Sequence, residues 1–144
     1  MAQKLYAEDL PYWMTSKSSA DTWLEKAAEE ISRAGGRVIS SGYMSDAVRG
    51  SAYMIQFELE KMPFRLVERV IESKAGKDKA AKVQAATTMY HDIKSRMITA
   101  RRKGARIAFL AELLLPGGQT VGEMEHGSFV ALVSGDDSPL LLNG

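Results

Sequence analysis

The sequence predicts an α+β fold, and three observations support this prediction. An amphipathic helical pattern comes first, two or three alternating strand patterns follow it, and further helical patterns come after the strands. Strands that follow one another without an intervening helix pair antiparallel, whereas a parallel sheet needs helices between its strands. We therefore expect an N-terminal helix, a two- to three-stranded antiparallel sheet, then a short and a long helix and a small C-terminal hairpin.

The composition is typical of one globular domain. The chain has 144 residues, of which 45% are apolar and 26% charged. We place a single α+β domain at residues 18–126, after an irregular arm at 1–17 and before a partly ordered tail at 127–144. The absence of cysteine excludes disulfides, thiol catalysis and thiolate-bound metals. No apolar run is long enough to span a membrane and no signal peptide is evident, so we expect no membrane contact and a cytoplasmic location.

The first helix has clear boundaries. Ser18 or Ser19 provides the N-cap, and Gly35-Gly36 ends the helix with a residue suited to a left-handed conformation. Apolar residues between these points recur at helical spacing while acids cover the other side. In the preceding arm, the apolar run Tyr12–Met14 needs a surface, and packing on its own domain is favoured over contact with a partner.

Two strand patterns follow the first helix, and a third is weaker. Arg37–Tyr43 is the first, and a turn-rich loop from Met44 to Gly50 separates it from Ala52–Glu60. In the second, the apolar residues Tyr53, Ile55, Phe57 and Leu59 alternate with polar ones, as in a half-buried antiparallel strand. Because Pro63 cannot donate to a ladder, Phe64–Leu66 is expected as a short edge strand.

Helical spacing then returns. Val67, Val70 and Ile71 predict a short helix that ends near Gly76, and a long helix is expected from Lys79 to Lys103. The long helix carries an apolar heptad pattern, formed by Val83, Ala86, Tyr90, Ile93, Met97, Ala100, Gly104 and Ile107. Such a narrow seam packs on one neighbouring helix or on a second copy of the chain, so a homo-oligomer through Val83, Tyr90, Ile93 and Met97 remains open.

The last predicted element is a small hairpin. Residues 106–115 continue as a short helix or a strand, and Pro116-Gly117-Gly118 forms a turn. Gln119–Val121 is a candidate return strand.

No pattern indicates an enzyme, a metal site or a cofactor. His91 and His126 have no patterned acids near them, and a metal site needs three or four converging ligands. Glu58 and Glu60 would share a strand face as paired catalytic carboxylates do, but a half-solvated sheet gives this pattern far more often. The two Gly-Gly pairs lack the spacing of a phosphate-binding loop. We therefore expect a non-enzymatic protein with no catalytic residue, no metal and no cofactor.

Charge is distributed unevenly along the chain. Residues 74–106 carry ten Lys or Arg and two Asp, a local charge of +8, whereas the other residues sum to −7. The first part of this segment surrounds a Gly-containing turn beside Asp78 and is interpreted as serving solubility; its cations are Lys74, Lys77, Lys79 and Lys82. A basic segment of this kind attracts a polyanion.

The second part of the basic segment is the candidate binding surface. Residues 93–111 hold six cations and no acid: Lys94, Arg96, Arg101, Arg102, Lys103 and Arg106. Exposed helices usually intersperse Glu for i,i+4 pairs, so an acid-free run favours a polyanion about as much as a bland solvated face. Four of the six are Arg, which suits bidentate phosphate contacts, and few aromatic residues lie near for base stacking. An acidic protein surface would be bound by the same residues.

Five short segments, taken in order, resemble a family of small proteins encoded by bacteriophages and integrated mobile elements. They are Gly35-Gly36-Arg37-Val38, Tyr53–Leu59, Pro63-Phe64-Arg65-Leu66, Tyr90-His91-Asp92-Ile93-Lys94 and Leu114-Leu115-Pro116-Gly117-Gly118-Gln119-Thr120-Val121. The likeness covers roughly residues 21–124; the chain departs from it by Met-Tyr-His where relatives favour Trp-Arg and by a more basic helix end. The family has no assigned activity, so the resemblance implies a phage or mobile-element setting and no catalytic residue.

Three hypotheses follow from the sequence. The first is a non-enzymatic accessory protein of replication or recombination type that binds the phosphate backbone of a nucleic acid through its basic helix. The second is a phage inhibitor that acts on a host defence or replication complex by protein–protein binding. The third is a small enzyme or nucleotide-binding protein.

Overall fold

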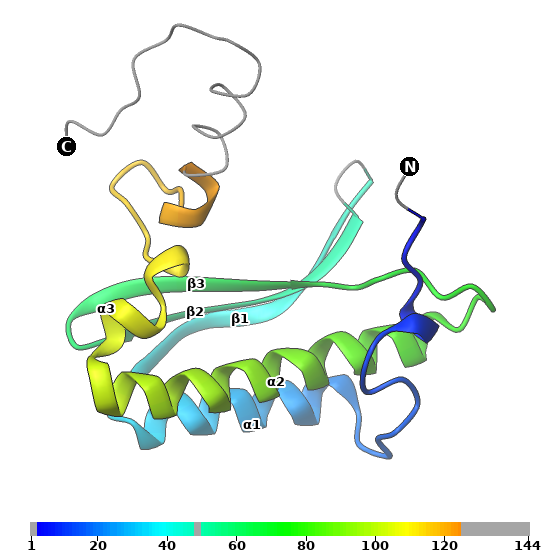
Figure 1. Cartoon of the computed structure of the whole chain (residues 1–144), viewed down its shortest axis with the longest axis horizontal. Helices are drawn as coiled ribbons and strands as arrows, with labels where there is room; N and C mark the ends of the chain where they lie inside the picture. Colours follow the sequence, from blue (N-terminus) through cyan, green and yellow to red (C-terminus); the bar gives the residue numbers. More distant parts are fainter. Residues whose placement is uncertain (1–2, 48–49, 125–144) are drawn as a thin grey trace, which may run out of the picture.

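Two helices cover one face of a three-stranded antiparallel sheet in the computed structural model, which describes residues 3–47 and 50–124 (Figure 1). The main elements are α1 (Ala20–Arg33), β1 (Arg37–Asp46), β2 (Gly50–Leu59), β3 (Met62–Arg69) and α2 (Asp78–Lys103). Short single turns complete the fold: η1 (Ala7–Asp9), α3 (Ala105–Ala108), η2 (Leu110–Glu112) and a helical turn at 121–124. The predicted α+β class is confirmed, whereas the predicted tail at 127–144 lies outside the described residues.

Helix α1 begins and ends where the sequence predicts. The Ser19 hydroxyl accepts a hydrogen bond from the Thr22 backbone N–H at 3.2 Å, and Gly35 adopts φ +86° just after the helix. Gly36 allows a close approach to the sheet, because a Cβ there would lie 2.8 Å from Ile31 Cγ2 and 2.9 Å from the Glu58 carbonyl oxygen. The glycine pair therefore both ends the helix and seats it against β2.

The sheet has the strand order β1-β2-β3 and a regular register between β2 and β3. Phe57 pairs with Phe64, and both side chains are fully buried on the face that the helices cover. Gln56 pairs with Arg65 on the opposite face. The predicted alternation along β2 is confirmed, since the four alternate apolar side chains are all buried: Tyr53, Ile55, Phe57 and Leu59.

The third strand is longer than predicted, and the short helix predicted from Val67 to Gly76 is wrong. Val67 pairs with Met54 in the β2–β3 ladder, and residues 70–77 form neither helix nor strand. The spacing of the apolar residues at 67, 70 and 71 suggested a helix, but the alternation that begins at buried Phe64 and Leu66 continues through β3. The predicted loop from Met44 is also shorter, because β1 extends to Asp46.

The β2–β3 connection is a two-residue turn in which both central residues have positive φ. Glu60 adopts φ 52° and Lys61 φ 65°, the backbone signature of a type I′ hairpin, which Asn-Gly usually fills. The Glu60 carboxylate accepts the Ala105 backbone N–H at 2.8 Å. This contact ties the turn to the start of α3 although the two segments are 45 residues apart.

The apolar seam of α2 packs inside the molecule. Ile93 is fully buried and Met97 is 3% exposed, and both belong to the core shared with α1 and the sheet. The interpretation of this seam as a contact between copies is therefore wrong at Ile93 and Met97, because α1 and the sheet already cover them. Val83 and Tyr90 are half-buried, whereas Ile107 is 61% exposed and lies outside the seam.

The segment after α2 closes one end of the core. Phe109 packs against Phe57 and Phe64 with ring centroids 5.2 and 5.7 Å apart. Residues 113–120 form the predicted small hairpin around the Pro116–Gly118 turn. It is shorter than a regular two-stranded hairpin, because its two arms share one bridge, between Leu114 and Thr120. Leu113 also bridges to Phe64, so the hairpin lies along β3.

The N-terminal arm packs on its own domain over the residues that the structure describes. The Glu8 carboxylate accepts hydrogen bonds from the Ser73 hydroxyl and from the backbone N–H groups of Lys74 and Ala75. Burial alone would raise the pKa of Glu8, but these three hydrogen bonds lower that pKa to about 2. The Gln84 side chain adds a 2.8 Å hydrogen bond to the Ala7 carbonyl. The arm is thereby attached to the β3–α2 connection and to α2.

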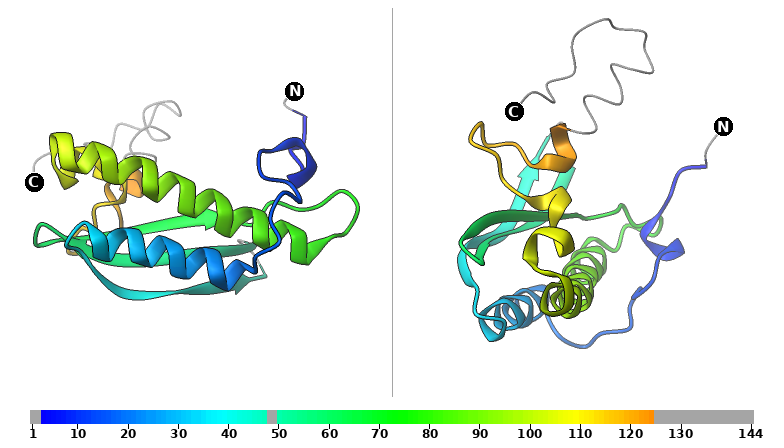
Figure 2. Two further views of the ribbon diagram at one scale, coloured as in Figure 1. Left: turned by 90° about the horizontal axis from the view of Figure 1, so that it is seen from below. Right: turned by 60° about the vertical axis from the view of Figure 1, so that its left-hand side comes forward.

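Helices α1 and α2 lie side by side and run in the same direction (Figure 2). An antiparallel sheet of three strands separates them in the chain, so α2 starts at the end of the molecule where α1 starts. Their two positive N-terminal ends therefore lie near each other, and their C-terminal ends lie together at the far end. The basic segment 74–106 thus spans the molecule from one end to the other.

Candidate functional site

The structure leaves five of the six predicted binding residues exposed and engages the sixth, Arg96, in contacts within the domain. Lys94 and Arg101 lie on the same side of α2, because seven residues make nearly two full helical turns. Arg102 and Lys103 complete the last turn of the helix, and Arg106 lies one turn further on in α3. All five side chains are exposed. Arg96 is the exception.

Arg96 is committed to contacts within the domain. Its Nε donates to Asp92 Oδ1 at 3.0 Å, and its Nη1 donates to the Glu112 carboxylate. Its guanidinium also lies 5.6 Å from the centre of the Phe109 ring. Arg96 therefore holds the segment after α2 against the helix, and it is not free to contact a phosphate.

The same region contains a carboxyl group with a raised pKa. Glu68 follows Phe64 and Leu66 on the helix-facing side of β3 and is half-buried. Burial is the main cause that raises the pKa of Glu68 to about 6. The negative charge of Asp92 raises this pKa further, and the positive charge of Arg96 lowers it. The interior beside Arg96 thus disfavours a further negative charge despite the arginine.

Most of the exposed residues among the predicted six lie at the C-terminal end of α2. Arg101, Arg102 and Lys103 occupy its last turn, where cations interact favourably with the helix dipole. Lys103 and Arg106 flank Glu60 across a shallow hollow of about 290 Å³. Within residues 3–47 and 50–124, no carboxylate forms an ion pair with any of these four cations. Their charge is available to an external anion.

Aromatic rings near the basic surface are engaged with each other. Tyr12 stacks on His91 at 4.6 Å, and Trp23 lies 5.2 Å from Tyr90. Lys26 Nζ lies 4.4 Å from the centre of the Trp23 ring. His91 is half-buried between these rings. Phe109 is fully buried and Tyr90 packs against Trp23, so neither ring is free for base stacking.

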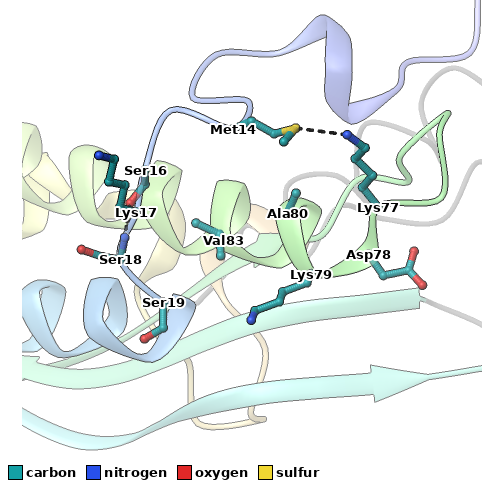
Figure 3. Close-up of a pocket in the computed structure, with 10 residues that line it drawn as sticks. All are labelled: Met14, Ser16, Lys17, Ser18, Ser19, Lys77, Asp78, Lys79, Ala80 and Val83. Carbon is teal, nitrogen blue, oxygen red and sulfur yellow. Dashed lines mark hydrogen bonds between the residues drawn. The ribbon is translucent and has the colours of Figure 1, made fainter.

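A second basic hollow lies at the opposite end of α2, and the sequence analysis missed it as a site. The hollow has a volume of about 550 Å³ and lies between residues 14–19 of the arm and the starts of α1 and α2 (Figure 3). Three lysines line it, Lys17, Lys77 and Lys79, against one acid, Asp78. The sequence feature that could have indicated this hollow is the cluster of lysines around Gly76, which the sequence analysis interprets as serving solubility.

The side of the sheet opposite the helices carries a third hollow, of about 710 Å³. Met54 and Val67 form part of its floor, and Arg65 borders it. Arg65 donates to Glu123 at 2.8 Å and to the Gly118 carbonyl at 3.1 Å. Arg65 is thereby used to hold the C-terminal hairpin, and Arg69 also lines the hollow.

The two glutamates considered as catalytic partners have separate structural contacts. Glu58 lies 3.5 Å from Arg37 on the neighbouring strand, whereas Glu60 binds the Ala105 backbone. His126 lies outside the described residues. In the part of the chain that the structure describes, no three His, Asp or Glu side chains gather so as to hold a metal ion. No helix in this part is both long and apolar enough to cross a membrane.

Comparison of the chain with protein-family models, with curated proteins and with solved structures finds no match. The fold is that of a small α+β protein in which two parallel helices cover one face of the sheet, and the second helix, α2, has cations at both ends. The argument for function therefore rests on the charges and geometry described above.

Proposed function

We propose that this chain is a non-enzymatic protein that binds nucleic acid through the phosphate backbone. The contacting residues are the exposed cations of the second half of α2 and of α3, which are Lys94, Arg101, Arg102, Lys103 and Arg106. Arg96, part of the predicted set, is left out because it pairs with Asp92 and Glu112. The accessory role in a phage or mobile element stays a proposal that rests on the resemblance over residues 21–124.

The observation that carries this proposal is that the cations at the C-terminal end of α2 form no ion pair among the described residues, although Glu60 lines the same hollow as Lys103 and Arg106. Surface cations in folded domains commonly have a carboxylate three or four residues away, as Arg33 has in Glu30. Arg101, Arg102 and Lys103 have none among the described residues, although like charges on adjacent turns repel one another. A polyanion would relieve this repulsion.

Backbone contact is favoured over base recognition. Guanidinium groups bind phosphate oxygens with paired hydrogen bonds, and such contacts position a protein without reading sequence. The nearby rings of Tyr90 and Phe109 are taken up by intramolecular packing. We therefore expect weak sequence preference and a strong dependence of affinity on salt.

The test compares two variants that lose the same charge. Arg101→Gln with Arg102→Gln removes two proposed contacts, whereas Lys4→Gln with Lys74→Gln removes two exposed cations at the other end of the molecule. Binding of a labelled 20-base-pair duplex is measured by fluorescence anisotropy at several salt concentrations. The slope of log affinity against log salt is negative, and the arginine variant should make it less steep by about 2. The lysine control should leave the slope nearly unchanged.

Two results would count against the proposal. Equal losses in the arginine variant and the lysine control would mean that only net charge matters. No binding by the folded wild-type protein at about 50 mM salt would exclude nucleic acid as the partner, and would favour the alternative of an acidic protein surface bound by the same arginines.

A further inference from the structure

We propose that the hollow at the start of α2 binds the terminal phosphate group of a nucleotide, with the phosphate on its lysines and the nucleoside on its apolar residues. The group it would recognise is a phosphomonoester, carried either by a free nucleotide or by the end of a nucleic acid strand. The hollow lies at the end of α2 opposite to Arg101 and Arg102, so this inference goes beyond the proposed function and does not depend on it.

Three lysines from two separate segments border the hollow. Lys17 comes from the arm, whereas Lys77 and Lys79 come from the start of α2. Within residues 3–47 and 50–124 none of the three forms an ion pair. Lys77 Nζ lies 3.7 Å from the Met14 sulfur, which is only a weak acceptor. All three ammonium groups are therefore available to a bound anion.

The acid that lines the hollow leaves a surplus of positive charge. Figure 3 shows the Asp78 carboxylate directed away from Ala80 and Val83, around which the three lysines are arranged. Asp78 forms no ion pair among the described residues. A phosphomonoester carries a charge of about −1.5 to −2 at pH 7, which matches three lysines and one acid better than the single charge of a phosphodiester does.

A hydroxyl group in the hollow adds a hydrogen-bond donor. Ser16 Oγ accepts hydrogen bonds from Trp23 Nε1 at 2.7 Å and from the Ser18 backbone N–H at 3.0 Å. Both of its lone pairs are then occupied, so its proton remains to be donated to another acceptor. A phosphate oxygen in the hollow would accept this proton in addition to hydrogen bonds from the lysines.

Apolar side chains line another part of the hollow. Met14 is 59% exposed, and Ala80 and Val83 are half-buried. Methionine is polarizable and adapts its shape, so these three residues offer a surface to the flat face of a base. Small-molecule sites combine such apolar residues with a few polar groups and have volumes of about 300–1,000 Å³, a range that includes the 550 Å³ of this hollow.

The concave shape favours a terminal phosphate over an internal one. Arm residues 14–19 border the hollow on one side, and the first two turns of α2 border it on the other. An internal phosphodiester continues into a nucleotide on both of its sides, whereas a terminal phosphate is attached to only one. A terminal phosphate can therefore enter the hollow without a second nucleotide that must leave it.

NMR titration of the full chain tests this inference, because methyl signals report on the hollow directly. The signals to follow are those of Met14, Ala80 and Val83. The probes are adenosine 5′-monophosphate, adenosine and inorganic phosphate, each added up to about 10 mM so that millimolar affinities are measurable. Comparison of the three probes separates the contribution of the phosphate from that of the nucleoside.

Two variants that lose the same charge are compared with the wild type. Lys17→Gln with Lys79→Gln removes two cations of the hollow, whereas Lys4→Gln with Lys74→Gln removes two cations that do not line it. Adenosine 5′-monophosphate should shift the three methyl signals of the wild type and bind more tightly than adenosine or inorganic phosphate. The hollow variant should weaken this affinity by about tenfold or more, because it loses hydrogen bonds from charged donors, and the control should change it by less than about twofold.

A short single strand with and without a 5′-phosphate distinguishes the two sources of the phosphomonoester. If only the phosphorylated strand shifts the methyl signals of the hollow, the natural ligand is a strand end. If neither strand shifts them while adenosine 5′-monophosphate does, the ligand is a free nucleotide. Either result supports the site and identifies its ligand.

Four outcomes would overturn the inference. They are no shift with adenosine 5′-monophosphate at the highest concentration, an equal affinity for adenosine, equal weakening in the two variants, and shifts confined to residues 101–106. The proposed function would survive each of the first three, because neither Arg101 nor Arg102 lines the hollow. Binding confined to residues 101–106 would support the proposed function while removing this second site.

Discussion

Arg96 illustrates how a single contact changes the interpretation of a charged run. In the sequence it belongs to six cations without an acid, and its i−4 neighbour Asp92 lies just outside that run. Its second partner, Glu112, is 16 residues away and reaches it only because the chain reverses after α3. No local pattern contains this reversal, so the sequence could indicate the i,i+4 pair with Asp92 but not the contact with Glu112.

Glu68 provides a prediction about pH dependence. Its folded-state pKa of about 6 lies above the ordinary value of 4.5, so the folded protein disfavours the ionised form. This cost is absent below about pH 4.5, where Glu68 is protonated in both states, and it grows as the pH rises through 6. Glu68→Gln should therefore raise the free energy of unfolding at pH 7 by about 1–2 kcal/mol.

Denaturant unfolding of Glu68→Gln and wild type at pH 7 and at pH 4 measures this effect. The gain at pH 7 should disappear at pH 4. Glu72 is an exposed carboxylate that pairs with Lys4. The variant Glu72→Gln serves as the control and should show no such gain. A stabilisation by Glu68→Gln that is the same at both pH values would contradict the raised pKa.

At the scale of elements, the sequence predicted α1, β2 and α2 closely because local rules fix them. Ser19 caps α1, Gly35 ends it, and apolar alternation marks β2. The spacing of the apolar residues at 67, 70 and 71 predicts a helix, but it is equally compatible with an edge strand that has one exposed apolar residue. Pairing of Val67 with Met54 decides between them, and such long-range pairing is invisible in a local pattern.

The parallel arrangement of α1 and α2 follows from the number of strands between them. Three antiparallel strands return the chain to the end where α1 begins, and α2 starts there. Because the sequence predicts either two or three strands, it does not determine whether α2 runs parallel or antiparallel to α1. Had three strands been certain, the approach of Lys17 to Lys79 could have been predicted, and with it the second basic hollow.

The β2–β3 turn gives a prediction at this scale. Lys61 holds φ 65°, a conformation that costs a residue with a Cβ about 1–2 kcal/mol relative to glycine. Lys61→Gly should therefore stabilise the protein by about 1 kcal/mol, which the shift of the denaturant midpoint measures. Lys61→Ala removes the same charge but keeps the Cβ, and it should give no gain. Equal effects of the two variants would show that charge, not backbone strain, is responsible.

Across the whole molecule, positive charge is concentrated on the segment that contains α2, and the rest of the chain is negative. The segment 74–106 carries +8 and the rest of the chain −7, and α2 presents the positive charge at both of its ends. The acids of this fold mostly serve internal contacts, as Glu8 does for the arm and Glu60 for α3. The sequence located the basic segment, whereas the structure distinguishes its exposed ends from the structural Arg96.

The salt dependence of duplex binding by the wild-type protein tests the central claim most directly. Anisotropy titrations of a 20-base-pair duplex between about 50 and 200 mM salt give the slope of log affinity against log salt. Contact of the five exposed cations of α2 and α3 with phosphates predicts a slope of about −4 to −5. A slope near zero, or no binding by folded protein at the lowest salt, would contradict the account.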